Sequence, residues 1–227
     1  MNEMHPVITV TDDGSHSLFN PELNECYHSK FGAITESEHI FIKCGLLKVS
    51  ETRSQINILE IGFGTGLNAL LTLRATMHSK KIHFTAVELY PIDKQIVKSL
   101  NYCDSWDLES YTDYFLTMHQ SAWEMDFKVT DNFTLNKIEI DLCNYQPPVN
   151  SFDLIYFDAF SPNVQPELWT TAIFQKLYNS LNENGILVTY CAKGIVKQAL
   201  RDAGFIVKRL TGPPGKRHII SAEKVKM

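Results

Sequence analysis

Three glycines that alternate with other residues follow an apolar run in the first third of the chain. The run covers residues 58–61, the glycines are Gly62, Gly64 and Gly66, and a helical pattern begins at Leu67. This pattern predicts a buried parallel strand that turns tightly into a helix whose N-terminus receives a ligand, because glycine lets a ligand approach the main chain closely. A dinucleotide fingerprint would need its third glycine at the position of Leu67, so the turn fits that fingerprint poorly.

Carboxylates stand at the ends of the strands that the hydrophobic pattern predicts. Because ligands of open α/β sheets bind outside the carboxyl ends of the strands, we expect these side chains around one site. Glu88, which ends the strand at 82–88, can accept from both hydroxyls of a ribose. Asp141 can accept from an adenine amino group, with Leu142 against the ring; a capping or surface role is the alternative for both acids. The acids at predicted strand ends are Glu60, Glu88, Asp141 and Asp158.

Glu60 stands two residues before the first glycine and completes the pattern E-x-G-x-G-x-G. This pattern is similar to the glycine motif of methyltransferases that depend on S-adenosyl-L-methionine (SAM). The similarity implies that the turn holds the methionine part of SAM; a dinucleotide site and a purely structural turn are the alternatives. The SAM-binding residues implied on this stretch are Glu60, Gly62, Phe63, Gly64, Thr65, Gly66 and Asn68.

Asp158 follows the apolar strand at 152–157, which would deliver its carboxylate beside the transferable methyl group. A methyl acceptor needs a free lone pair, but an amine with a pKa near the lysine value of about 10.4 is protonated at neutral pH. A carboxylate can bind such a cation and let a proton leave, so Asp158 is a candidate catalytic residue and SAM contact. Phe160 can pack on a base or on the sulfonium. The alternatives are a structural cap for Asp158 and core packing for Phe160.

Strands and helices alternate through most of the chain, which predicts a doubly wound, mostly parallel sheet. The last two predicted strands, 205–210 and 218–222, have no helix between them and should pair antiparallel. That ending is typical of class I SAM-dependent methyltransferases, so we predict an α/β, Rossmann-like sheet of seven strands with an antiparallel last strand. Residues 1–50 are predicted to add a β-hairpin and a helix with a capping box at Thr35 and Glu38, and residues 51–227 to form the methyltransferase domain.

The composition suits one domain of 227 residues with a net charge of −5. No apolar run reaches the roughly 20 residues of a membrane helix, and residues 1–10 lack the pattern of a secretory signal. The five cysteines include no C-x-x-C pair, which argues against a zinc site or a disulfide framework. We therefore expect a cytoplasmic, monomeric protein without a metal and without membrane contact.

Residues 60–68, 157–169 and 212–218 occur together and in order, and the middle segment contains Asp158-Ala159-Phe160-Ser161-Pro162. The chain resembles the MnmC/MnmD-type methyltransferases, which complete 5-methylaminomethyl(-2-thio)uridine at the wobble position (U34) of tRNA. The resemblance runs over about residues 13–222. It implies SAM as the donor and the amine of 5-aminomethyl(-2-thio)uridine, in the anticodon stem-loop of tRNA, as the acceptor. Fused members carry an FAD-dependent oxidase domain after the methyltransferase, and we expect no FAD here.

The positive charge is concentrated at the C-terminal end. Residues 193–227 hold nine Lys and Arg against two Asp and Glu, whereas the other 192 residues hold 12 against 24. This end can be a phosphate-contacting face or a solvated helix and strand edge. The resemblance favours the first interpretation, with Lys216 and Arg217 at the anticodon loop and Lys193, Lys197 and Arg201 at flanking phosphates.

Two features leave other interpretations open. The segment at 27–33 also resembles a family segment near the SAM pocket, where Tyr27, Ser29 or Glu36 could close over the ligand. The glycine motif also fits another amine-directed methyltransferase or an aminopropyltransferase of polyamine synthesis, although the basic C-terminal end argues against a polyamine substrate. A non-catalytic SAM-fold module that binds RNA is a further alternative, against which Glu88 and Asp158 argue.

Overall fold

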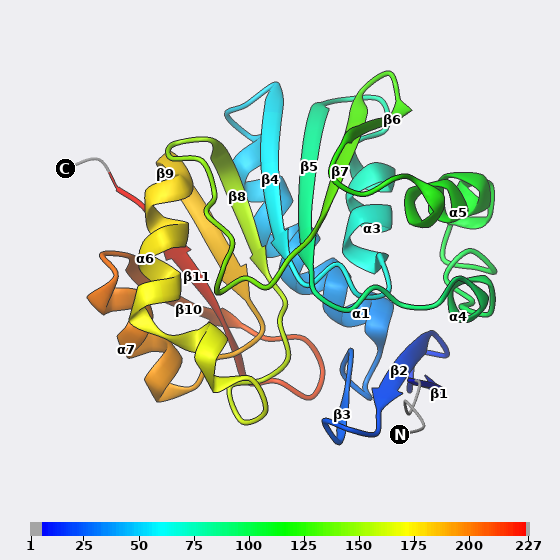
Figure 1. Ribbon diagram of the computed structural model, residues 1–227, viewed down its shortest axis with the longest axis horizontal. Coiled ribbons are helices and arrows are strands. Elements are labelled where there is room, and N and C mark those ends of the chain that lie inside the picture. Colours follow the sequence, from blue (N-terminus) through cyan, green and yellow to red (C-terminus); the bar gives the residue numbers. More distant parts are fainter. Residues whose placement is uncertain (1–5, 226–227) are drawn as a thin grey trace.

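The computed structural model describes residues 6–225, and one large sheet runs through its centre (Figure 1). The strand order is β10-β11-β9-β8-β4-β5-β7-β6. Strands β7, β5, β4, β8 and β9 run parallel, whereas β11 is antiparallel to both β9 and β10. The bounds are β4 Gln55–Ile61, β5 Lys81–Glu88, β6 Asp126–Thr130, β7 Phe133–Glu139, β8 Phe152–Phe157, β9 Leu181–Thr189, β10 Ile206–Thr211 and β11 His218–Glu223.

The mostly parallel sheet and its antiparallel last strand are confirmed, but the sheet has eight strands and not seven. The additional strand is β6, the first arm of the hairpin that the sequence pattern predicts before Asp141. It pairs antiparallel with β7 and extends the edge of the sheet, with a shift of register between Lys128 and Thr130. A hairpin pattern does not reveal whether both arms or only one will join the sheet.

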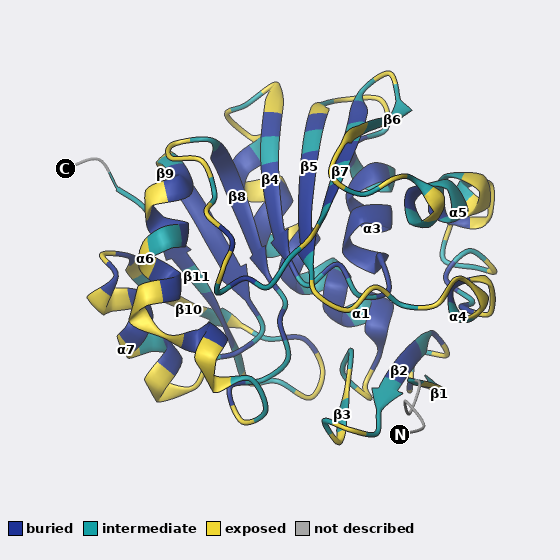
Figure 2. Ribbon diagram, viewed as in Figure 1, coloured by how far each residue is buried: buried dark blue, intermediate teal, exposed yellow. Residues whose placement is uncertain are grey.

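The central strands are buried on both faces, as Figure 2 shows by their colour. Ile58 of β4 and Tyr156 of β8 face one hydrophobic core, whereas their neighbours Leu59 and Phe157 face a second core. Successive side chains of a strand point to opposite faces, so a strand covered on both sides needs a continuous apolar run. The runs of β4 and β8 therefore hold the two ends that carry Gly62 and Asp158 in fixed positions.

Helices cover each face of the sheet. One core is closed by the N-terminal helical segment, by α3 and by the helices that follow β5, and the other by the helices on either side of β9. Gly45 lies against the sheet, where a Cβ atom would be 3.1 Å from Val188. The first group comprises α1 Ala33–Ser37, the π-helical η1 Glu38–Leu46, α2 Leu47–Ser50, α3 Leu67–Thr76, α4 Lys94–Lys98, η2 Glu109–Tyr111 and α5 Thr112–Gln120; the second comprises η3 Pro166–Trp169, α6 Thr171–Ser180 and α7 Gly194–Asp202.

The predicted capping box at Thr35 and Glu38 is wrong. Helix α1 begins at Ala33, and the cap comes from Asp13, whose Oδ2 accepts from the Thr35 amide (3.0 Å) and hydroxyl (2.7 Å). Glu38 instead forms an ion pair with Arg74. The spacing of Thr35 and Glu38 matches a capping box, but a partner from the preceding segment occupies the helix start.

The N-terminal segment forms a small antiparallel sheet of its own, with β1 Val7–Val10, β2 His16–Asn20 and β3 Glu25–Cys26. The predicted hairpin corresponds to β1 and β2, and β3 adds a third short strand. Figure 1 shows this sheet below the carboxyl ends of β4 and β5, beside the start of α1. The domain boundary at residue 50 stays a prediction.

Candidate active site

A cleft of about 1010 Å³ opens at the carboxyl edge of the sheet. Its walls come from the glycine turn after β4, the ends of β5, β7 and β8, the segment after β2, and the loop between β10 and β11. Residues that the sequence assigns to SAM, to the acceptor or to RNA meet there. Those that line the cleft are Gly62, Phe63, Gly64, Thr65, Asn68, Glu88, Asp141, Leu142, Asp158, Phe160 and Lys216.

Other residues predicted for the site do not line the cleft. Glu60 is 1% exposed and lies beneath its surface, and Gly66 is the N-cap of α3 with a φ of 73°. Lys193, Arg201 and Arg217 are exposed and Lys197 is half-buried, on or beside α7 and the C-terminal loop. Lys193 donates from Nζ to Asn163 Oδ1 at 2.7 Å, which places it beside the loop that follows Asp158.

The glycine turn is built around the close approach of two strand ends. Gly62 has a φ of 89°, and a Cβ atom there would lie 2.9 Å from the carbonyl oxygen of Asp158. The Gly62 amide donates to Val87 O at 2.9 Å, and the Asp158 amide donates to Ile61 O at 3.0 Å. Only glycine meets both the left-handed backbone and the short contact, so the turn fixes the ends of β4, β5 and β8 relative to one another.

Glu88 organises the same turn from the neighbouring strand. Its Oε2 accepts from the Gly64 amide and its Oε1 from the Leu89 and Tyr90 amides, each at 2.9 Å. Burial raises the pKa of Glu88, and these three backbone donors oppose that rise. Each carboxylate oxygen can accept more than one hydrogen bond, so the side chain can also accept from a ligand hydroxyl in the cleft. Its predicted contact with a ribose stays a prediction.

Asp158 and Asn68 form a second polar part of the cleft wall. Asn68 Nδ2 donates to Asp158 Oδ2 at 2.9 Å. Burial raises the pKa of Asp158 well above its ordinary value, and the nearby Glu36 carboxylate raises it further. Because a carboxyl group with a raised pKa is a stronger base once it is ionised, Asp158 is suited to receive a proton.

Glu60 sits behind this pair. Burial raises the pKa of Glu60 well above its ordinary value, and the charges of Asp158 and Glu88 act in the same direction. The nearby Asn68 side chain opposes this rise, but among residues 6–225 neither carboxylate oxygen of Glu60 has a partner with full hydrogen-bond geometry, and the same holds for Asn68 Oδ1 at the cleft wall. The site thus holds more acidic and acceptor groups than its own donors satisfy.

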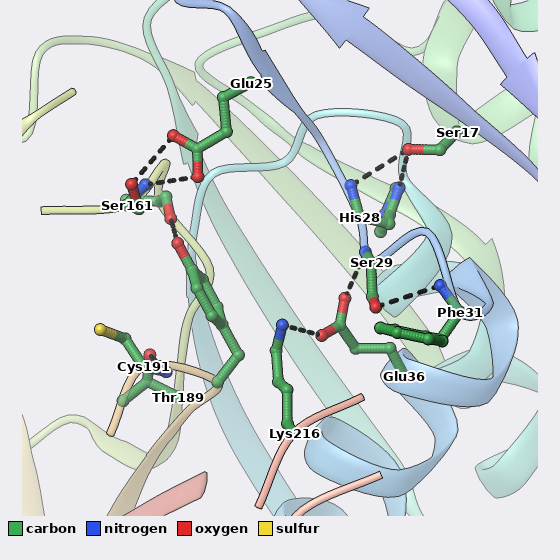
Figure 3. Close-up of polar contacts among 12 residues, drawn as sticks. Ser17, Glu25, His28, Ser29, Phe31, Glu36, Ser161, Thr189, Cys191 and Lys216 are labelled. Atoms are coloured by element: carbon green, nitrogen blue, oxygen red, sulfur yellow. Dashed lines mark hydrogen bonds and ion pairs between the residues drawn. The ribbon is translucent and has the colours of Figure 1, made fainter. Parts of the chain in front are cut away.

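Lys216 lines the cleft, and Figure 3 shows its side chain directed at Glu36, whereas Arg217 is exposed. Its Nζ is 2.9 Å from Glu36 Oε1 and 5.1 Å from the centroid of the Tyr190 ring. Glu36, 8% exposed, also accepts from the Ser29 amide at 2.8 Å through Oε2. The basic end of the chain therefore contributes one cation to the interior of the site.

Tyr190 is a cleft residue that the sequence reasoning missed. It follows β9 directly, donates from its hydroxyl to Ala159 O at 2.9 Å, and so supports the main chain next to Asp158. Burial raises the pKa of Tyr190, and Asp158 adds to that shift. The rule that polar residues at strand ends form the site would have found it, because the same rule identifies Glu88 and Asp158.

The N-terminal sheet reaches across the cleft to the loop after β8. Glu25 accepts from the Ser161 hydroxyl at 3.0 Å, as Figure 3 shows, and the rings of Tyr27 and Phe160 meet edge to face at 4.9 Å. Tyr27 also lies over the glycine turn, 3.3 Å from the position of a Cβ atom at Gly64. Phe160, predicted to pack on a base or on the sulfonium, thus forms one edge of the opening together with Tyr27.

The sequence profile of a family described as S-adenosyl-L-methionine-dependent methyltransferase matches residues 103–225. This match covers more than half of the chain. The chain belongs to this family. SAM-dependent methyl transfer is therefore its class of chemistry, and the place of SAM in the cleft at the glycine turn stays a prediction. The profile match begins after the glycine turn, so that motif and the sheet topology support the assignment independently.

Similar proteins extend the comparison over nearly the whole chain. The tRNA 5-methylaminomethyl-2-thiouridine biosynthesis bifunctional protein MnmC of Burkholderia multivorans is 29% identical over 95% of this chain and 34% of its own length. The protein of the same name from Cupriavidus metallidurans is 29% identical over 94% of this chain and 33% of its own. The chain thus spans about a third of the curated relatives that it matches.

Solved structures with the same fold include MNMC2 from Aquifex aeolicus, with a TM-score of 0.81 and 23% identity over 99% of this chain and 71% of that one. Spermidine synthase from Thermotoga maritima follows with a TM-score of 0.55 and 17% identity over 97% of this chain and 73% of that one. At these identities the similarity shows the fold, a class I SAM-dependent methyltransferase fold.

The residues of the cleft fit SAM. The unpartnered Asn68 Oδ1 offers an acceptor to an ammonium group, while Glu88 offers acceptors to ribose hydroxyls. Asp141 accepts from the Cys143 amide through Oδ1 at 2.8 Å, and the adjacent Leu142 is buried at the cleft wall. When bound, SAM supplies a methyl group activated by its sulfonium.

No helix in residues 6–225 is long and apolar enough to span a membrane, and no metal-binding group of His, Cys, Asp and Glu occurs in that range.

Proposed function

We propose that this methyltransferase transfers the methyl group of SAM to the primary amine of 5-aminomethyl(-2-thio)uridine at the wobble position of tRNA. The product would be 5-methylaminomethyl(-2-thio)uridine. In this proposal the chain acts as a monomer in the cytoplasm, and the anticodon stem-loop enters the cleft from the side of the C-terminal loop.

One observation carries the proposal: the cleft that suits SAM ends in an acidic cluster instead of a neutral acceptor site, and of its members Glu36 and Glu60 are buried and Asp158 is half-buried. Asp158 and Glu36 line it, and Glu60 lies directly behind. The carboxylates of Asp158 and Glu36 are costly in low-dielectric surroundings unless a cation joins them. An acceptor that arrives as an ammonium ion matches this charge, whereas a hydroxyl or a carboxylate acceptor does not.

The roles of individual residues follow from this match. Asp158 binds the ammonium group and receives its proton, so that the nitrogen lone pair becomes available for the methyl group. The glycine turn, Asn68 and Glu88 hold SAM in line with that nitrogen, and Asp141 with Leu142 holds the adenine. Phe160 packs against the uracil base or the sulfonium. Alignment of the two reactants in a closed cleft supplies a large share of the rate.

The tRNA assignment rests on the relatives and on the charge of the C-terminal end. The curated relatives are named for tRNA 5-methylaminomethyl-2-thiouridine biosynthesis. Lys193, Arg201 and Arg217 are exposed on one end of this chain, where they can neutralise phosphates. Lys197 lies on the same helix as Arg201 and adds to this face.

The decisive experiment is a mass analysis of wobble nucleosides in tRNA from cells that lack this protein. We expect 5-aminomethyl-2-thiouridine to accumulate and the methylated nucleoside to disappear. Purified protein with SAM should then convert this tRNA, whereas the D158N variant should not. Normal amounts of the methylated nucleoside in the deficient cells would contradict the proposal.

The acidic cleft also leaves room for a polyamine acceptor in an aminopropyl transfer. The same purified protein should therefore be given putrescine with decarboxylated SAM. Formation of spermidine without any tRNA methylation would replace the tRNA proposal with the polyamine alternative. We expect no spermidine, because the exposed cations of α7 and the C-terminal loop favour a polyanionic partner.

A further inference from the structure

Lys216 occupies a position that a substrate cation would need. Its ammonium group lies 2.9 Å from Glu36 and over the Tyr190 ring, and Glu36 and Asp158 line the same cleft. The Lys216 charge opposes the rise in the pKa of Asp158 that burial and Glu36 cause. Among the described residues that line the cleft, Lys216 is the only Lys or Arg. It is therefore the internal counter-ion of the acidic cluster.

The contacts of Lys216 are those of an exchangeable group. Its side chain retains 26% of its exposure, whereas that of Glu36 retains 10%. Glu36 is held in place through Oε2 by the Ser29 amide, so its Oε1 stays directed toward the cleft without Lys216. A lysine ammonium sits on a flexible four-carbon stem and can leave while the main chain stays in place.

The main chain next to Lys216 is firmly packed. Gly215 has a φ of 81°, and a Cβ atom there would lie 1.9 Å from Cδ2 of Phe31. The Lys216 amide donates to Pro213 O at 3.0 Å, which closes the turn. Exchange at Glu36 therefore requires a rotation of the Lys216 side chain and no opening of the loop.

We propose that Lys216 is a placeholder: its ammonium group occupies the subsite of the acceptor amine and is displaced from Glu36 when the substrate ammonium enters. This inference rests on the proposed function, because it assumes a cationic amine acceptor. The displaced Lys216 turns toward the exposed Arg217 side of the loop, where the RNA backbone approaches. The cleft thus keeps its charge balance in both states, and a neutral nucleoside has no means of displacing the lysine.

The test compares two ligands that lack phosphates, the nucleosides 5-aminomethyluridine and 5-methyluridine. Their binding to the protein saturated with S-adenosylhomocysteine is measured by calorimetry. Removal of the competing cation in the K216M variant should tighten binding of the amine nucleoside about fivefold, a change typical of losing one partly exposed ion pair. Binding of 5-methyluridine should not change. The matched control is K208M, because Lys208 pairs with Glu223 on the surface of β10.

A second variant tests the other half of the subsite. In E36Q the amide oxygen can still accept from the Ser29 amide, but the negative charge is lost, so the amine nucleoside should bind at least about fivefold more weakly. Binding of S-adenosylhomocysteine reports that each variant is folded. Binding of the amine nucleoside to K216M that is unchanged, weaker or undetectable would overturn the placeholder.

Failure of this inference differs from failure of the proposed function. If wild-type protein does not methylate tRNA that carries 5-aminomethyluridine, the proposed function is wrong, and the placeholder is wrong with it. If wild-type protein methylates this tRNA but K216M gains no affinity for the amine nucleoside, only the placeholder is wrong. Lys216 would then be a fixed partner of Glu36 or a direct contact of the RNA.

Discussion

Asp158 is the residue at which the two halves of the site meet. It touches the glycine turn through its main chain and Asn68 through its side chain, and it belongs to the acidic cluster. The D158A variant should lose methylation by at least about a thousandfold, a typical loss for a group that acts in the transition state. Its affinity for SAM should stay within a few fold, since the Asp158 main chain that packs on Gly62 is retained.

Single-turnover methylation of tRNA and calorimetry with SAM separate the two effects. The conservative variant D158N keeps the side-chain shape and the contact with Asn68, and it should be equally inactive. Methylation by either variant at the wild-type rate would refute the catalytic role.

Glu60 has a measurable effect on stability. Its folded-state pKa lies above the unfolded value of about 4.3, so the folded protein holds the proton after the unfolded chain has lost it. The stabilisation from this proton is fully present below the unfolded pKa and is lost as the pH rises toward the folded pKa. E60Q should remove this loss. At pH 8 its melting temperature should exceed that of the wild type by about 2–4 °C for each kcal/mol that the substitution adds to the free energy of unfolding.

Thermal unfolding of wild type and E60Q from pH 5 to pH 8 checks this prediction. The difference between the two proteins should grow as the pH rises. E51Q is the matched control, because Glu51 is exposed and the same substitution there should leave the curve unchanged. A difference that shrinks with rising pH would contradict the prediction. It would show that Glu60 is ionised in the folded protein and that a neighbouring group balances its charge.

The sequence predicts part of this residue-level arrangement. Glu88 and Asp158 follow apolar strands directly, so their place at the sheet edge follows from the pattern. The pairing of Glu36 with Lys216 could not be predicted, because it joins a helix near the start of the chain to a loop near its end. Likewise, nothing in the spacing of Glu60 tells whether its side chain faces the cleft or the layer beneath it.

At the scale of elements, the glycine turn is the structure that tolerates change least. Alanine at Gly62 would have to adopt a φ of 89° and place its Cβ atom 2.9 Å from Asp158 O. G62A should therefore lower the free energy of unfolding by at least about 2 kcal/mol and weaken SAM binding, because β4 and β8 must separate.

A matched substitution exists on α7. A Cβ atom at Gly194 would meet no atom within 4 Å, so G194A should be neutral or stabilise the protein by up to about 1 kcal/mol. Urea unfolding and SAM calorimetry on both variants provide the comparison. Equal effects of the two substitutions would contradict the strand-end contact at Gly62.

The order of elements was predictable because apolar runs and turn signals alternate clearly. The limits of prediction lie at the elements that depend on distant partners. Helix α1 starts at Ala33 because Asp13, which is 22 positions before Thr35, reaches the first turn of the helix. The local sequence carries no record of that partner.

At the scale of the whole molecule, charge is segregated between the cleft and the C-terminal end. The double variant K197E/R201E should weaken tRNA binding at least tenfold in low salt and reduce the salt dependence of binding, because two phosphate contacts are lost. Its affinity for SAM should stay unchanged, since neither residue lines the cleft.

Filter binding at several salt concentrations measures this effect. The control is K48E/K81E, which changes the net charge by the same amount at two exposed lysines. Lys48 lies on α2, and Lys81 lies at the start of β5, at the end of the strand away from the cleft. If both double variants weaken tRNA binding alike, the effect is one of net charge, and the C-terminal face is not the RNA contact.

The hydrogen bond between Glu25 and Ser161 also bears on how the protein folds during synthesis. These two residues are 136 positions apart, and the Tyr27–Phe160 contact spans a similar length. During synthesis, β1 to β3 leave the ribosome before the loop after β8, so they cannot form their contacts with that loop until it has been made. Since contacts of long sequence separation form late, the mouth of the cleft should assemble after the glycine turn and before the Glu36–Lys216 pair, whose second residue leaves the ribosome later still.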